Sequence, residues 1–502
     1  MRCILELYVQ EFMTYKQVLL GLSTEPALMI REHKLKPLDY ESVQLLKTNN
    51  ISKPKTDSGH IFSNHALLML IIPVIAEQFL TSLMGLADSM MVSNVDDYSL
   101  GAVQLVDSIN ILVNQAFAAL ATGGVVICSN FIGQKNKDKA QEAARQVSLS
   151  ALILSVSITL ICLLFRNGIL NTVFGKVEDA LMVKAQVYFF ITILSFPGIA
   201  LYNAGSAIYR AQGNTRRPLL ISIVCNFINI AGNAVFIYVF GLGVAGAALS
   251  TFISRWLSAI VVFAYLHNKD QMISIRDYRT IRPQGYLIKR VLALGIPNGI
   301  ENSMFQFGKL VIQSTVSTMG TVAITAQAMT NIMENVNGVA ACGVGIGLMT
   351  VVGQSLGAGR KDEARYYVKK MAVWAEIAII LSCLFVFALR GPITSLGGMN
   401  YESAKLCMYM CGLITIVKPL FWVPAFLPAY GMRAAGDVRF SMILSVISMW
   451  TIRVGVTIAL VHVFGFVSPV AVWCGMFSDW FVRGVFFTIR FMSGKWLDHK
   501  VA

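Results

Sequence analysis

The chain has 502 residues, of which 56% are hydrophobic and only 14% are charged, and its mean hydropathy is +0.64. A soluble globular protein carries about 25% charged residues. These values exclude an ordinary soluble domain and favour a protein with many membrane-spanning helices. A formal net charge of +14 could suggest a nucleic-acid partner. We predict none, because the basic residues concentrate in particular loops between apolar segments.

The first 62 residues mix polar and apolar positions and include the linker-like stretch TNNISKPKTDSGH. No small-residue cleavage site follows an apolar core there, so the sequence predicts no cleaved signal peptide. We interpret residues 1–62 as a polar, cytoplasmic extension.

Twelve apolar runs of 20 or more residues follow, and each is long enough to cross the hydrocarbon core of a bilayer. The sequence therefore predicts an all-α polytopic membrane protein with twelve transmembrane helices. The runs begin near Ala66, Ala102, Ala143, Val183, Leu219, Val244, Val291, Ala323, Val368, Ala404, Met442 and Pro469.

Lysine and arginine are distributed unequally between the loops. Loops after even-numbered runs hold most of them, as in GQKNKDKAQEAAR and GAGRKDEARYYVKK, whereas loops after odd-numbered runs hold few. Cytoplasmic loops carry such an excess in membrane proteins. The pattern predicts a multi-pass protein of the plasma membrane with both termini in the cytoplasm.

The second half of the sequence repeats the first at an offset of about 224 residues. IIPVIAEQF, from Ile71, aligns with GIPNGIENS, from Gly295, and RAQGNTR aligns with RAAGDVR. Each half has six runs, so both halves enter the membrane in the same orientation. A parallel repeat of this kind predicts two six-helix lobes around a central cavity. The expected parts are an N-lobe (63–267), a cytoplasmic linker (268–290), a C-lobe (291–495) and a cytoplasmic tail (496–502).

The motifs of common enzyme classes are missing from the sequence. It contains no P-loop, no GxSxG and no HExxH, which are signatures of nucleotide-binding and hydrolytic sites. The nine cysteines lack the spacing of a metal site. We therefore predict a secondary active transporter rather than an enzyme, with no bound cofactor.

The first apolar run contains two carboxylates, although a charge near the centre of a membrane helix costs at least about 2.5–3.5 kcal/mol. Glu77 and Asp88 are eleven residues apart, which is about three helical turns, so they lie on nearly one face. Pro73 removes one backbone donor and favours a bend in this helix. We predict that Asp88 binds a coupling ion and that Glu77 is a weaker candidate for binding cargo or the ion.

The fifth run, CNFINIAGNAVFIY, carries Asn226, Asn229 and Asn233 on one helical face. Amide oxygens beside a carboxylate are suitable ligands for a hard cation such as Na⁺. Hydrogen bonding between helices is the alternative interpretation, above all for Asn226.

Other charges within the runs have plausible structural roles. We expect Asp107, Glu334 and Glu376 to be paired or to lie near the ends of their runs. Arg255 and Asp479 occupy equivalent positions in the two halves, which favours a structural role at least as strongly as a role in transport.

Several phrases occur in an order and at a spacing that resemble the multidrug and toxic compound extrusion (MATE) family. The resemblance covers about residues 63–495 and implies an antiporter that admits Na⁺ or H⁺ while it exports organic, often cationic, compounds by alternating access. We expect such a protein to act as a monomer. The phrases are GLADSMMVS, RAQGNTRRP, NFINIAGNAVFIYVFGLGVAGAALST, GIPNGIENSMFQFGKL and VVGQSLGAGRKDEA.

The resemblance also implies roles for individual residues. Asp88, Asn229 and Thr251 match a cation site of the family and imply a Na⁺ ion there. Asn233 stands where some members have a second aspartate. Glu301 matches a glutamate of the seventh helix and is our candidate for attracting cationic cargo. The tenth run contains no carboxylate in VKPLFWVPAFLPAYGMR, so a second ion site known in some members is altered or missing here.

A flippase for a lipid-linked saccharide or pyrophosphate is the main alternative, and a receptor-like or structural membrane protein is a third. Lys309, Lys418, Arg453 and Arg255 favour the flippase because its cargo is anionic. Twelve runs and Asp88 favour the antiporter.

The loop charges generate a prediction about topology. In a cysteine-free background, a cysteine at Gln284 should resist an impermeant thiol reagent in intact cells and react once the membrane is opened. A cysteine at Asn94, in the first predicted outer loop, is the control and should react in intact cells. Labelling at position 284 in intact cells would contradict both the topology and the parallel repeat.

Overall fold

The computed structural model describes residues 60–175, 177–268, 271–276 and 282–499, all within one compact unit, Lys55–Ala502. Most of the predicted N-terminal extension, seven residues of the predicted linker and the end of the tail lie outside the described residues. The described part of the chain contains helices and turns but no β-strand.

The first half of the described chain forms the elements of the expected N-lobe. α7 and α8 form one bent segment, with 43° between them, and the π-helix η1 continues α9 directly. The elements are α3 (Asn64–Ser93), α4 (Asp97–Gly133), α5 (Lys137–Leu164), α6 (Arg166–Phe174), α7 (Asp179–Leu194), α8 (Phe196–Ala211), α9 (Arg216–Asn233), η1 (Ala234–Val239) and α10 (Gly243–Leu266).

The second half follows the same plan. Its fifth segment contains two π-helical stretches, η3 and η4, where the first half has only η1. The elements are α11 (Gly285–Ser317), α12 (Thr321–Gly357), α13 (Lys361–Leu396), α14 (Tyr401–Ala434), α15 (Val438–Ile447), η3 (Ser448–Val454), α16 (Gly455–Ile458), η4 (Ala459–Val463), α17 (Val470–Met492) and the short η5 (Lys495–Asp498).

Local sequence explains where several helices begin. The side chain of Ser63 accepts a hydrogen bond from the Ala66 backbone at the start of α3, and Asp96 caps α4 in the same way. Asn136 caps α5 and Asn400 caps α14. Each cap satisfies a backbone N–H that has no partner within its own helix.

The described chain contains ten helices that are long and apolar enough to cross a membrane, or eleven when the bent pair of α7 and α8 counts as one. The remaining predicted span is α11. Its 33 residues are long enough to cross, but it carries several polar and charged residues, including Glu301 and Lys309.

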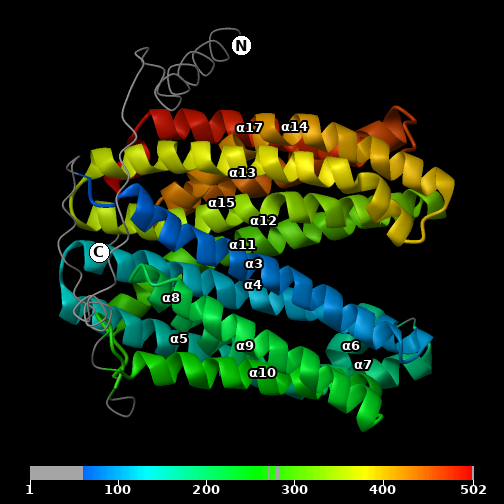
Figure 1. Ribbon diagram of the computed structural model, residues 1–502, viewed down its shortest axis with the longest axis horizontal. Helices are drawn as coiled ribbons and strands as arrows, with labels where there is room; N and C mark the ends of the chain where they lie inside the picture. Colours follow the sequence, from blue (N-terminus) through cyan, green and yellow to red (C-terminus); the bar gives the residue numbers. More distant parts are fainter. Residues whose placement is uncertain (1–59, 176, 269–270, 277–281, 500–502) are drawn as a thin grey trace, which may run out of the picture. The chain divides into compact units, whose positions relative to one another are not determined.

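The helices form two bundles that correspond to the two halves of the sequence. In Figure 1 the helices α12, α13, α14 and α17 lie together above, and α4, α5, α9 and α10 lie together below. The bundles meet where α4 packs against α11 and α12, and where α3 packs against α12. The two halves of the repeat therefore form two lobes, which contact each other through α3, α4, α11 and α12.

The lobes approach most closely at the ends of α4 and α12. A Cβ atom on Gly133 would lie 2.1 Å from the Gln354 carbonyl oxygen, and one on the equivalent Gly357 would lie 2.0 Å from that of Asn130. Real Cβ atoms do not approach so closely, so only glycine permits this contact. The side chain of Gln354 also donates to the backbone oxygen of Ala211 across the lobes at 2.7 Å. These contacts close the molecule at this end.

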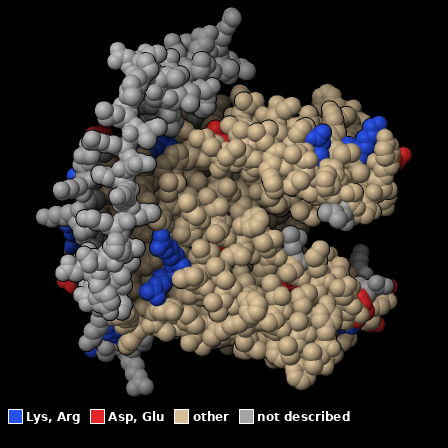
Figure 2. Space-filling model, viewed as in Figure 1, with Lys and Arg blue, Asp and Glu red and all other residues tan. Residues whose placement is uncertain are grey.

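The opposite end is open in this structure. Figure 2 shows the face hollowed between the two lobes at the end where α6 and α7 lie. The close contact between the lobes therefore lies at one end of their interface and the hollow at the other.

The glycine contact generates a prediction. Gly357→Ala should separate the lobes at the sealed end, so a cysteine at Ser129, whose side chain is fully buried, should react faster with a thiol reagent. The measurement is the labelling rate in a background without other cysteines. Gly391→Ala is the control because no atom lies within 4 Å of its added Cβ. An unchanged rate in Gly357→Ala would show that the lobes tolerate the extra atom.

Candidate functional site

Asp88 lies in α3, within the N-lobe, and its carboxylate contacts α9. The amide Nδ2 of Asn233 donates to Oδ1 of Asp88 at 2.6 Å. Asn233 is the last residue of α9, directly before the π-helix η1. Short π-helical stretches within α-helices are frequent at functional sites. The structure thus joins two of the residues that the sequence singled out.

Asn229 lies one turn before Asn233 and connects α9 to α10. Its Nδ2 donates to the hydroxyl of Thr251 at 3.3 Å, and Ser250 donates to its backbone oxygen at 2.6 Å. Gly232 permits this approach, because a Cβ there would lie 2.6 Å from the Ser250 hydroxyl. Close packing of α9 on α10 therefore brings Asn229 and Thr251 together, as the resemblance implied.

Two amide oxygens at this site have no hydrogen-bond partner. Oδ1 of Asn229 and Oδ1 of Asn233 are both buried and unsatisfied, which is rare in native structures. Together with the Asp88 carboxylate they supply the oxygen donors that a hard cation prefers. The residues present therefore fit a Na⁺ ion, with Asp88 as its formal negative charge.

A second carboxylate lies near Asp88. Asp107 of α4 accepts hydrogen bonds from Asn110 at 3.1 Å and from the hydroxyl of Tyr188 at 3.4 Å. Asp88 interacts electrostatically with both Asp107 and Arg255. Sequence reasoning gave Asp107 a structural role and did not name Tyr188. No sequence signal identifies Tyr188, because its contact joins α7 to α4.

Asn226 stays apart from this group. Its side chain donates to the Ser222 hydroxyl of its own helix at 3.4 Å, and in the described part of the chain it makes no hydrogen bond to Asp88. The three asparagines therefore have three different partners: Asn233 bonds to Asp88, Asn229 to Thr251 and Asn226 to Ser222.

Glu77 and Glu301 are buried in equivalent ion pairs, one in each lobe. Arg210 donates to Glu77 at 2.8 Å, and Tyr202 donates to the same oxygen at 3.2 Å. In the other lobe, Arg433 donates to Glu301 at 2.6 Å. Each arginine neutralises its glutamate, so neither carboxylate offers a free charge to cargo in this state. Their predicted role in binding cargo stays a prediction.

Two further acids have different surroundings. Glu334 accepts a hydrogen bond from Lys418 at 2.7 Å, as expected for a paired charge in a membrane span. Glu376 lies in the middle of α13 and has no ion-pair partner among the residues that the structure describes. Glu376 is therefore unpaired in the described part of the chain, and its place near the end of its span, six residues after Lys370, stays a prediction.

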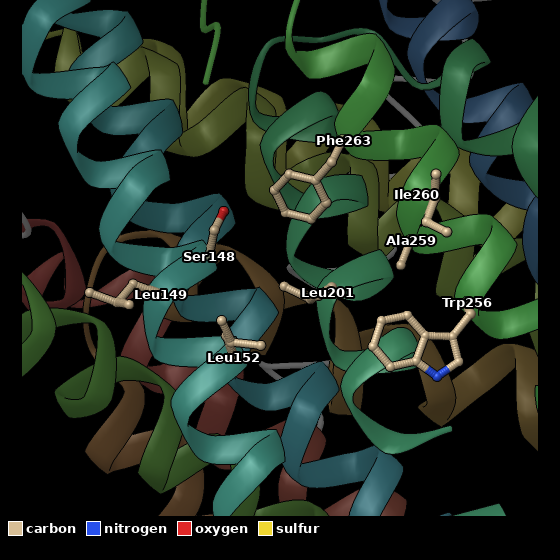
Figure 3. A pocket seen from close by; sticks show the side chains of 8 residues that line it. All are labelled: Ser148, Leu149, Leu152, Leu201, Trp256, Ala259, Ile260 and Phe263. Carbon is tan, nitrogen blue, oxygen red and sulfur yellow. The ribbon is translucent and has the colours of Figure 1, made fainter. Parts of the chain in front are cut away.

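One cavity of about 320 Å³ lies in the N-lobe, and its lining includes neither Asp88 nor Asn229, Asn233 or Thr251. Figure 3 shows its lining side chains, which come from α5, α8 and α10 and are apolar except for Ser148. Ile260 of the lining is mostly exposed, so the cavity opens to the outer, lipid-facing surface. It suits an acyl chain better than an ion or a charged cargo. The lining consists of Ser148, Leu149, Leu152, Leu201, Trp256, Ala259, Ile260 and Phe263.

Comparison with known protein families identifies the family of this chain. The MatE family model matches the chain twice, over residues 73–235 and 297–458, and the two matches cover more than half of the chain. The chain belongs to the MATE family. The two matches begin 224 residues apart, which is the offset of the internal repeat.

Individual MATE relatives match nearly the whole described chain. The uncharacterized transporter YisQ of Bacillus subtilis is 28% identical over 471 residues, 91% of this chain and 99% of YisQ. The probable multidrug resistance protein NorM of Thermotoga maritima is 24% identical over 439 residues, 87% of this chain and 93% of NorM.

Solved MATE structures share the fold. A multidrug resistance MATE transporter in an outward-facing conformation matches with a TM-score of 0.79 and 20% identity, over 86% of this chain and 96% of that chain. A MATE protein in a straight conformation matches equally well, with a TM-score of 0.79. The predicted fold class, an all-α membrane protein with two lobes, is confirmed. The chain is a multi-pass membrane transporter.

The Glu301 pair generates a prediction for this MATE protein. Glu301→Gln leaves the partly buried Arg433 guanidinium without its charged partner, which should destabilise the protein by up to about 3 kcal/mol, the lower end for a buried pair, and lower its melting temperature in detergent. The double variant Glu301→Gln/Arg433→Gln should regain most of this loss, and Glu402→Gln at an exposed position should change little. If Glu301→Gln is fully stable but exports cationic compounds poorly, Glu301 acts on cargo, as the sequence predicted.

Proposed function

We propose that this MATE protein is a cation-coupled antiporter, which takes in Na⁺ or H⁺ and exports organic compounds by alternating access. The observation that carries the proposal is the Asp88 group. Asp88 of α3 has no ion-pair partner in the described structure and accepts a hydrogen bond from the amide nitrogen of Asn233, while the amide oxygens of Asn229 and Asn233 are buried without a hydrogen-bond partner. An unpaired carboxylate in a membrane span is costly, and uptake and release of a cation would explain its presence there.

The position of Asp88 explains how ion binding would influence the lobes. α3 packs against α9 in its own lobe and against α12 in the other, so a change in α3 affects the contact between lobes. Pro73 lies within α3 and weakens the helix locally. A cation on Asp88 favours one shape of α3, and cargo favours the other. Because coupling between two sites is reciprocal, cargo must weaken cation binding to the same extent.

Topology assigns a direction to this cycle. If the basic loops and both termini are cytoplasmic, the sealed end at Gly133 and Gly357 faces the cytoplasm and the hollow end faces outward. The described structure is then the state that releases cargo and loads the ion from outside. The protein would act as a monomer in the plasma membrane.

The cargo class follows from the relatives and from charge. Several relatives are named as multidrug resistance proteins, which supports small organic cargo. Asp88 and Asp107 outnumber Arg255 in the N-lobe interior, so this wall suits a cationic group. None of the relatives named above favours the flippase alternative.

The central test is Asp88→Asn. This change keeps the size and the hydrogen bond to Asn233 but fixes the charge at zero, so expression should stay near normal and gradient-driven efflux should be abolished. The measurement is ethidium export from proteoliposomes with Na⁺ and H⁺ gradients imposed separately, which also identifies the coupling ion. Asp179→Asn, at an exposed position, is the control. Normal export by Asp88→Asn under every gradient would leave Asp88 a structural partner of Asn233.

A further inference from the structure

The C-lobe contains the repeat equivalent of the Asp88 site, but its charges are reversed. At the repeat offset of 224 residues, Asn229 corresponds to Arg453 and Arg255 corresponds to Asp479. The equivalent of Asp88 is the apolar Ile312. The same place in the fold therefore carries carboxylate and amide groups in the N-lobe, whereas in the C-lobe a guanidinium stands in place of Asn229.

Asp479 is fully buried and already shared by two arginines. Its Oδ2 lies 3.2 Å from the guanidinium of Arg453, and its Oδ1 accepts from Arg483 at 2.7 Å. Ser448 also donates to Oδ1 at 2.5 Å. One negative charge thus faces two positive charges.

A third cation joins the arginines around one aromatic ring. The ring centre of Phe305 lies 5.0 Å from Cζ of Arg453, 5.7 Å from Cζ of Arg483 and 5.1 Å from Nζ of Lys309. Lys309 has no carboxylate within ion-pair distance among the described residues, and the nearby Glu334 is engaged by Lys418. These side chains form the C-lobe basic cluster: Phe305, Lys309, Arg453, Asp479 and Arg483.

The cluster has more donors than acceptors. Nε of Arg453 and the indole nitrogen of Trp450, both on η3, are buried without a hydrogen-bond partner, and so is Oδ2 of Asp479, which has only its charge contact with Arg453. The three cations Lys309, Arg453 and Arg483 nevertheless outnumber the single carboxylate of the cluster. Lys309 is exposed, although it lies within a membrane span and interacts electrostatically with Arg453. Charged side chains in such spans face the bundle interior or a water-filled cavity rather than lipid. Lys309 therefore presents an uncompensated positive charge to the space inside the protein.

We propose that the C-lobe basic cluster binds the acidic group of an aromatic, amphoteric cargo, such as a compound with both an amine and a carboxylate. This inference rests on the proposed export of organic compounds and specifies their class. The carboxylate lies at Lys309, the aromatic part packs near Phe305, and the basic group faces the acidic wall of the N-lobe. A purely cationic cargo would leave the positive charge of Lys309 unmatched.

The test compares two dyes that differ in one group. Rhodamine 110 carries a free carboxylate, and rhodamine 123 is its methyl ester. Binding of each dye to the purified protein, in nanodiscs of phosphatidylcholine without anionic lipid, is measured by fluorescence polarisation. The wild type should bind rhodamine 110 more tightly. Lys309→Met should weaken rhodamine 110 binding about tenfold, the effect of one lost charge-assisted contact, and change rhodamine 123 binding less than about twofold.

Controls separate this role from folding and from coupling. Lys309→Arg keeps the charge and should restore the preference, whereas Lys289→Met removes a charge from the same helix and should have no effect. Equal losses for both dyes, or a wild type that does not prefer rhodamine 110, would contradict the proposal. Because binding needs no gradient, the preference should persist in Asp88→Asn, so failure of the coupling mechanism would be distinguishable.

Discussion

The cost of holding a charge in an apolar membrane span governs the arrangement of this protein. Most ionisable side chains inside the lobes are neutralised by a partner on another helix, as Glu77 is by Arg210 and Glu334 is by Lys418. Each pair joins segments that are far apart in the sequence. The same physical cost makes Asp88 and Lys309 informative, because neither has an opposite charge within ion-pair distance in the described structure.

The internal repeat supplies one scaffold for two kinds of chemistry. The pair of Glu77 with Arg210 and the pair of Glu301 with Arg433 keep the same residue types in both lobes. The charged groups deeper in the lobes diverge, since Arg255 is replaced by Asp479 and Asn229 by Arg453. The two ion pairs that occur in both lobes fit a shared structural role, because each joins the first helix of its lobe to another helix of that lobe. Divergent groups fit different ligands, a cation in one lobe and an acidic cargo group in the other.

The seal between the lobes depends on small residues rather than on charge. Gly133 and Gly357 allow α4 and α12 to approach until backbone atoms touch, and side-chain hydrogen bonds to the backbone oxygens of Arg210 and Ala211 hold the contact. A seal made of neutral contacts can open without separating ions in a low-dielectric medium, where such separation is costly. Such a contact fits the proposed alternating-access cycle, in which the lobes part.

The sequence by itself determined the architecture. Apolar length predicted the spans, including the run from Val291 that forms α11, and the near-constant offset predicted two homologous lobes. The sequence also identified Asp88, because a carboxylate in an apolar helix is conspicuous, and the asparagines that share a face of α9.

Only the tertiary structure shows which side chains contact one another across helices. Spacing along one helix could not show that Glu77 and Glu301 meet arginines from other helices, that Asn233 rather than Asn226 reaches Asp88, or that Tyr188 contacts Asp107. It also could not show that Lys309, Arg453 and Arg483 surround one phenyl ring. Helical periodicity specifies which face a residue occupies, but the identity of the opposing face depends on how the helices pack.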